Sequence, residues 1–139
     1  MNVLVDTPVW SLSLRRKPED LSTGEKKIVA ELTELIQEGR GRIIGPVRQE
    51  LLSGIRTPRQ YEELRAALRA FPDETIGAGD YETAAKASND CRAKGIVVSA
   101  VDILICAVAL RGNFPIFTTD HDFQHYASVL PIKLHVSRK

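Results

Sequence analysis

The sequence has few cysteines, no long apolar run and almost no net charge. Each of these features excludes some classes of protein. Its two cysteines, Cys91 and Cys106, have no spacing typical of zinc sites or of a disulfide scaffold. The longest apolar stretch, residues 103–110, is far too short to span a bilayer. The first residues lack the basic region of a signal peptide. We therefore expect a cytoplasmic protein without a membrane segment.

The composition is that of an ordinary globular domain. With 139 residues, 43% hydrophobic and 27% charged, we expect one domain over residues 1–139. The net charge of +1 is unevenly distributed. Residues 40–69 hold seven arginines against three glutamates (+4), and residues 73–122 hold four cations against eight acids (−4). Each arginine alone is typical of a solvated helix face, but together they favour a polyanionic ligand.

Apolar runs that alternate with helical patterns predict an α/β fold with a mostly parallel sheet. The predicted strands cover residues 2–5, 42–45, 116–118 and 132–136, and residues 74–76 fit either a strand or a connection. The predicted helices open at Thr7, at a capping box over residues 22–25, at Pro46, near Tyr61, at Asp80, at Ser99 and at Asp120. On the helix over residues 80–93, we expect Tyr81, Ala84, Ala85 and Ser88 to face inward.

Four carboxylates stand next to apolar segments. Asp6 ends the first apolar run, Asp102 interrupts the longest one, and Asp120 follows the strand predicted at residues 116–118. Glu50 flanks the apolar stripe of a short helix, where we expect it to border the buried face. Ionised side chains are rarely buried without a partner or a metal, so something must neutralise these acids.

Helix capping offers a simpler explanation for three of the acids. Asp6 and Asp120 could each cap the helix that follows, and Ser99 with Asp102 matches a capping box. If all four acids met at about 5–7 Å, however, each pair would repel by roughly 2–3 kcal/mol. The total would approach the stability of an average domain, so acids would protonate or a cation would enter. Ligands that are all oxygen favour Mg²⁺ or Mn²⁺.

The segments that hold these acids resemble the motifs of the PIN-domain family, and most closely those of VapC-type toxin ribonucleases. They read LVDT at 4–7, RQELLSG at 48–54, SAVDILICA at 99–107 and FTTDHDF at 117–123, in the family's order and over nearly the full chain. Pro8 departs from the small residue common after the first Asp-Thr pair, but proline suits a first helical turn.

The resemblance implies a PIN-like three-layer fold and a Mg²⁺- or Mn²⁺-dependent endoribonuclease whose products carry a 5′-phosphate and a 3′-hydroxyl. Asp6, Glu50, Asp102 and Asp120 match the family's acidic metal-binding quartet, Thr7 and Thr118 match hydroxyls that steady it, and Asp122 matches a secondary acid. Asp6 and Asp102 would be the principal metal ligands and Asp120 would complete the shell. Glu50 would bind metal or orient the attacking water.

The resemblance also implies partners: an RNA substrate, a cognate VapB-type antitoxin that fills the acidic groove, and a second copy in a homodimer. Two alternatives stay open. One is a PIN nuclease of RNA processing without a toxin role, and the other is a protein-binding module in which the acids only cap helices.

Two further patterns have ordinary structural explanations. His121 and His125 stand four residues apart, but the sequence nearby offers no third nitrogen or sulfur ligand for zinc. Residues 15–17, Arg-Arg-Lys, close the first helix, where cations interact favourably with the helix dipole. A role for them in RNA binding is the less favoured interpretation.

Overall fold

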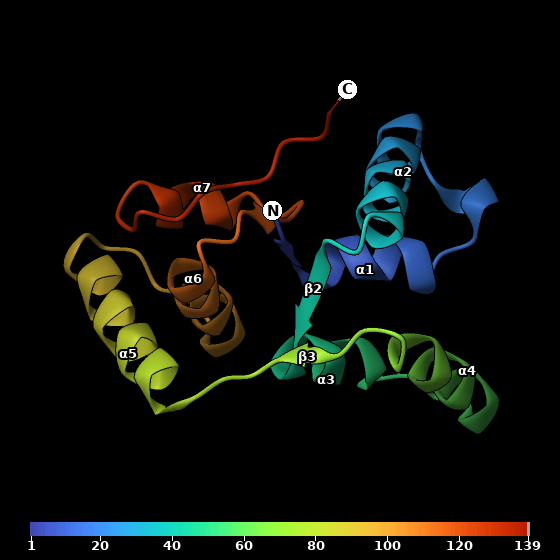
Figure 1. The fold of residues 1–139 in the computed structure, drawn as a ribbon, viewed down its shortest axis with the longest axis horizontal. Helices are drawn as coiled ribbons and strands as arrows, with labels where there is room; N and C mark the ends of the chain where they lie inside the picture. The colour runs from blue at the N-terminus through green and yellow to red at the C-terminus, as the bar shows by residue number, and fades with distance from the viewer. Residues whose placement is uncertain (139) are drawn as a thin grey trace.

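A four-stranded, all-parallel sheet forms the centre of the molecule in the computed structural model, which describes residues 1–138 (Figure 1). The strand order is β3-β2-β1-β4, with β1 at Val3–Val5, β2 at Gly41–Ile44, β3 at Asp73–Glu74 and β4 at Ile116–Phe117. Leu4 pairs with Arg42 on one side and with Ile116 on the other. The predicted α/β class and parallel sheet are confirmed.

Helices cover both faces of this sheet and complete three layers. In Figure 1, α1 and α2 lie on one side of the strands and α5 and α6 on the other. The helices are α1 (Thr7–Leu14), α2 (Thr23–Gln37), α3 (Gly45–Leu52), α4 (Pro58–Leu68), α5 (Ala78–Ala93), α6 (Ala100–Gly112) and α7 (Asp122–Ala127), with a 3₁₀ turn at Pro18–Asp20. The capping box predicted at Ser22 and Glu25 is present at the start of α2.

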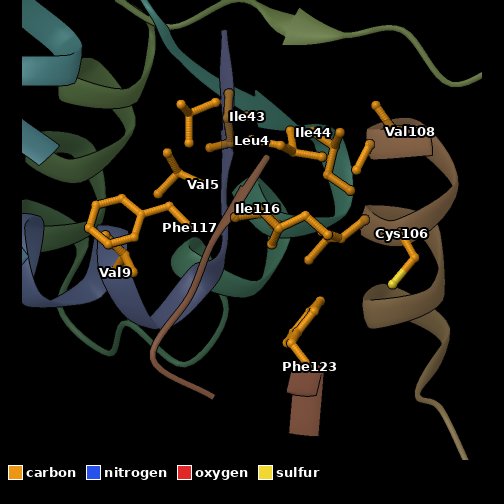
Figure 2. Packing of buried hydrophobic residues seen from close by; sticks show 14 of the residues in the cluster. Leu4, Val5, Val9, Ile43, Ile44, Cys106, Val108, Ile116, Phe117 and Phe123 are labelled. Carbon is orange, nitrogen blue, oxygen red and sulfur yellow. The ribbon is translucent and has the colours of Figure 1, made fainter. Parts of the chain in front are cut away.

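Alternating side chains on the strands join the two helical layers into one core. Figure 2 shows Val5 and Phe117 directed toward Val9 of α1, and Ile116 directed toward Cys106 of α6. Leu4, at the centre of β1, is also fully buried. Strands buried on both faces read as continuous apolar runs, which explains why residues 3–5 contain no polar residue.

The carboxyl ends of β1, β2 and β4 meet at one edge of the sheet, because the strands are parallel. The β1–β4 ladder continues one residue past β1, where the Asp6 amide donates to the Phe117 carbonyl at 2.9 Å. Helix α1 begins at the next residue, and α3 follows β2 without an intervening residue. These short connections keep the residues after each strand close to the sheet edge, where ligands bind in such folds.

The strand predicted over residues 132–136 forms only a single parallel bridge, between Ile116 and Leu134. Two hydrogen bonds flank that bridge, from the Ile116 amide to the Lys133 carbonyl and from the His135 amide to the Ile116 carbonyl, both 2.8 Å. The partner strand β4 has only two residues, so it offers no longer ladder for this segment to extend.

The inward face predicted for α5 is wrong in part. Tyr81 is 55% exposed and Ala85 is exposed, whereas Asp80, Ala84, Ala87 and Cys91 are buried. The buried line is anchored by an ion pair that the apolar pattern did not reveal. Arg111 Nε of α6 donates to Asp80 Oδ1 at 2.8 Å, which turns the start of α5 toward α6.

The structure bears on two features noted in the sequence, the short apolar stretches and the two cysteines. No helix within residues 1–138 has both the length and the apolar character needed to cross a membrane. Both cysteines are free and buried, and burial raises the pKa of the Cys106 thiol well above its usual range. Cys106 is therefore a small core residue.

Most arginines of the basic segment are already paired within the protein. Arg40 pairs with Glu38, Arg42 with Glu74, Arg59 with Glu63 and Arg65 with Glu62. Arg48 of α3 donates to Asp73 Oδ1 at 2.9 Å, to the Leu68 carbonyl at 2.8 Å and to the Phe71 carbonyl. Arg48 therefore links α3 to the end of α4 and to β3, and its guanidinium serves the fold.

Replacing Arg48 by methionine should lower the free energy of unfolding by about 2–4 kcal/mol, because two part-buried carbonyls lose a charged donor. Denaturant unfolding followed by circular dichroism would measure the change. The exposed Arg56 is the matched control, and Arg56→Met should stay within about 0.5 kcal/mol of the wild type. Equal stability of the two variants would contradict a structural role for Arg48.

Candidate active site

Asp6 is the most buried of the predicted site acids, with 3% of its surface exposed. It is the N-cap of α1, and its Oδ1 accepts a hydrogen bond from the Thr7 amide at 2.8 Å. Its Oδ2 accepts from Thr118 Oγ1, also at 2.8 Å. The pKa of the Asp6 carboxyl is raised to about 6, chiefly by burial and to a smaller extent by the charges of Asp102 and Asp120, against the lowering effect of those two hydrogen bonds.

Asp102 lies in the first turn of α6 and is half-buried. Its Oδ2 accepts a hydrogen bond from the hydroxyl of Tyr126 on α7 at 2.9 Å. Burial raises the pKa of Asp102, and the nearby acids Asp120 and Glu50 raise it further. The predicted capping role is half realised, because Ser99 Oγ accepts from the Asp102 amide at 3.1 Å while the Asp102 carboxylate turns to Tyr126.

Thr118 ties Asp120 to Asp6. Its hydroxyl donates to Asp6 and accepts from the Asp120 amide at 3.0 Å. The Asp120 carboxylate accepts from the Asp122 amide at 2.9 Å, so Asp120 stabilises the start of the short helix α7. Asp122, the predicted secondary acid, is exposed and contributes its backbone amide to this turn.

Glu50 departs from the expected burial. It is exposed, so the prediction that it borders the buried face is wrong. The eight-residue α3 buries Val47 and Leu51, and Glu50 lies on the solvent side of that pair. Thr7 nevertheless holds it at the site, because Thr7 Oγ1 donates to Glu50 Oε1 at 2.6 Å.

Two threonines and one tyrosine thus hold the acids, which come from four separate elements. Thr7 links Asp6 to Glu50, Thr118 links Asp6 to Asp120, and Tyr126 holds Asp102. The sequence reasoning identified both threonines but missed Tyr126. The available signal was its place three residues after Phe123 on a buried helical face, since a buried tyrosine hydroxyl needs a partner.

The chemistry of this cluster suits a divalent cation. None of the ion pairs formed by residues 1–138 includes Asp6, Glu50, Asp102 or Asp120. The donors are all carboxylate oxygens, which suit Mg²⁺ or Mn²⁺ better than softer metals. Within the same residues, no three such side chains stand close enough together to hold an ion as they are. The carboxylates are chemically suitable ligands for a divalent cation, but their side chains are not already arranged around one binding position.

The comparisons agree with this architecture. The family model described as the PIN domain matches residues 3–129. No curated protein has a significant sequence match to the chain. Three similar solved structures are FitAcB from Neisseria gonorrhoeae (TM-score 0.76, 20% identity, 97% of both chains), VapBC2 from Rickettsia felis bound to promoter DNA (0.74, 16%, 97% and 98%) and VapBC-1 from nontypeable Haemophilus influenzae (0.71, 16%, 100% of both). The match of the family model over residues 3–129 shows that this chain belongs to the PIN-domain family, and the acids at the carboxyl ends of the strands agree with it.

Proposed function

We propose that this protein is a Mg²⁺- or Mn²⁺-dependent endoribonuclease that acts as the toxin of a toxin–antitoxin pair. The observation that carries the proposal is Asp6, a buried carboxylate with two further acids nearby and no cation paired to it within residues 1–138. A buried charge without a partner costs folding free energy, so the needs of the fold do not explain it. In a nuclease the same charge has a use, because it would bind the metal that contacts the phosphate.

Asp6 and Asp102 would be the principal metal ligands, and Asp120 would complete the set. A divalent ion held by them would lower the pKa of a water and offset the charge that develops on the phosphate during hydrolysis. Thr118 links the Asp6 carboxylate to the Asp120 backbone amide. Tyr126 fixes the rotamer of Asp102.

Glu50 suits a second task, which is to orient the attacking water or to add a metal ligand. It is exposed at the mouth of the site, and the hydrogen bond from Thr7 limits where its carboxylate can point. An exposed carboxylate can exchange protons with solvent, as a group that positions or deprotonates a water must do.

The toxin assignment rests on the kind of assemblies that the similar structures describe. The Rickettsia felis and Haemophilus influenzae structures are VapBC complexes, and a similar structure from Klebsiella pneumoniae is described as a toxin–antitoxin complex (TM-score 0.61, 19% identity, 88% and 90% coverage). On this basis we propose a single nuclease domain over residues 1–139. It would act in the cytoplasm as a homodimer and be held inactive by a VapB-type antitoxin.

The first test is cleavage of labelled total cellular RNA by the purified protein with Mg²⁺, with Mn²⁺ or with EDTA. Wild type should cut only with metal, and Asp6→Asn should lower cleavage by more than about a hundredfold, because a principal metal ligand is lost. The exposed Asp90 of α5 provides the matched control, and Asp90→Asn should cut as the wild type does. Cutting in EDTA, or by Asp6→Asn, would contradict the proposal.

The second test measures stability and does not require enzymatic activity. In the metal-free protein, ionised Asp6 should lower the free energy of unfolding. The folded pKa of about 6 lies above the ordinary 3.8, so stability falls as pH rises from about 4 to 6 and stays low above it. Asparagine removes the charge and still accepts from Thr7. In EDTA at pH 7.5, Asp6→Asn should therefore be more stable than the wild type by about 2–3 kcal/mol, and the gain should vanish near pH 4.

Denaturant unfolding at both pH values measures this difference, with Asp90→Asn as the control. Added Mg²⁺ or Mn²⁺ should then raise the melting temperature of the wild type and leave that of Asp6→Asn unchanged. A variant that is less stable than the wild type at both pH values would assign Asp6 to helix capping alone.

A further inference from the structure

A surface pocket of about 520 Å³ opens beside the acid cluster, between α1 and the start of α2. Pro8 and Thr119 form the part of its lining nearest the acids. Pro8 follows Thr7, which bonds to Glu50, and Thr119 stands between Thr118 and Asp120. Two lining residues on different elements are therefore adjacent in sequence to residues of the site: Pro8 follows Thr7, and Thr119 precedes Asp120.

The pocket has one apolar side, formed by Pro8, Leu12 and Ile28. Leu12 is itself buried, and Ile28 is half-buried, so these side chains form a firm wall. A flat apolar molecule could lie against such a wall, and nucleobases of single-stranded RNA pack on apolar and planar side chains in this way.

The pocket lining also includes polar side chains. Ser11, Arg16 and Thr119 contribute two hydroxyls and a guanidinium. Within residues 1–138 neither the Ser11 nor the Thr119 hydroxyl takes part in a side-chain hydrogen bond. Hydroxyls that both donate and accept suit the edges of a base or a ribose.

Arg16 is the basic residue of this lining. Its side chain is 44% exposed, and its hydrogen bond and its ion pair with other residues of 1–138 use one terminal nitrogen. That nitrogen donates to the Asp20 carbonyl at 3.2 Å and lies 3.9 Å from Glu25, whose carboxylate already accepts from the Ser22 amide. The rest of the Arg16 guanidinium remains available to bind a phosphate or stack on a base.

The pocket on the other side of Thr7 has a different character. Glu50, Gln49 and Ser53 contribute to its lining, which includes a carboxylate and no basic side chain. The α1–α2 pocket also has a carboxylate in its lining, Glu25, but Arg16 lies 3.9 Å from it and the Ser22 amide donates to it. Because the Glu50 pocket has no basic side chain in its lining, a phosphate is better accommodated on the Arg16 side. The two sides of the site therefore differ in what part of an RNA strand they accept.

From these contacts we infer that the α1–α2 pocket binds one nucleotide of the RNA next to the scissile bond. Its base would lie against Pro8, Leu12 and Ile28, and its phosphate would be held by Arg16. The inference rests on the proposed nuclease function, and it assigns to this pocket the selection of the nucleotide at one flank of the cut. Arg16 binds and positions the substrate and takes no part in the bond-breaking step.

The kinetic test compares Arg16→Ala with Arg15→Ala, which removes the neighbouring arginine from a different pocket, between α1 and α4. On an RNA oligonucleotide that spans a mapped cut, Arg16→Ala should raise KM on the order of tenfold or more and change kcat by less than about twofold. Arg16→Lys should recover part of the loss, and Arg15→Ala should match the wild type. Unchanged KM for Arg16→Ala would overturn the proposal.

A second variant fills the pocket. Ser11→Tyr should alter which sites are cut in total cellular RNA, with its folding checked by circular dichroism. If Ser11→Tyr keeps the wild-type cleavage pattern but escapes inhibition by the cognate antitoxin, the pocket is a peptide site and the RNA proposal is wrong.

A crosslinking experiment separates this proposal from the proposed nuclease function. Asp6→Asn protein is mixed with randomised single-stranded RNA containing 4-thiouridine and irradiated, and the crosslinked peptides are identified by mass spectrometry. Crosslinks within residues 8–28 or at Thr119 support the pocket even if the wild type cuts no RNA. Crosslinks confined to other segments, such as residues 46–53, would overturn it even if the wild type is an active nuclease.

Discussion

The buried carboxylate of Asp6, at the carboxyl end of β1, is the constraint on which the rest of the site depends. β1 is an interior strand of the sheet, and the residue after it is 3% exposed. Among residues 1–138, two hydrogen bonds to its side chain, from Thr7 and Thr118, offset the loss of hydration. The same two threonines bind the Glu50 carboxylate and the Asp120 amide, so the groups that stabilise Asp6 also hold the neighbouring acidic residues.

The features that could be predicted from sequence are those set by local chemistry. The apolar runs at residues 3–5 and 116–117 could only be buried strands, and the Ser22 and Glu25 capping box marked the start of α2 correctly. Parallel strands then place their carboxyl ends at one edge. For this reason Asp6 and Asp120, which each follow a strand, could be placed at one edge of the sheet from topology alone, and Thr118 links them there.

The features that could not be predicted depend on partners distant in sequence. Arg48 belongs to the arginine-rich segment that favoured a polyanionic ligand, but carbonyls about twenty residues away occupy its guanidinium. Tyr126 became part of the site because α7 packs near the start of α6, a contact that no periodicity encodes. The exposure of Glu50 has the same cause, since the side that α3 buries is decided by the helices around it.

Helix α1 joins the two halves of the proposed site. Thr7, at its first position, touches the acids, and Arg16 lies two residues beyond its last. Eight residues of helix span roughly 12 Å, a rigid spacer between bond cleavage and nucleotide selection. Pro8 has two roles, because its ring suits the first turn of the helix and also forms part of the pocket wall. In the proposed site, a substitution at Pro8 that keeps the helix would therefore alter which RNA is bound while leaving the acids in place.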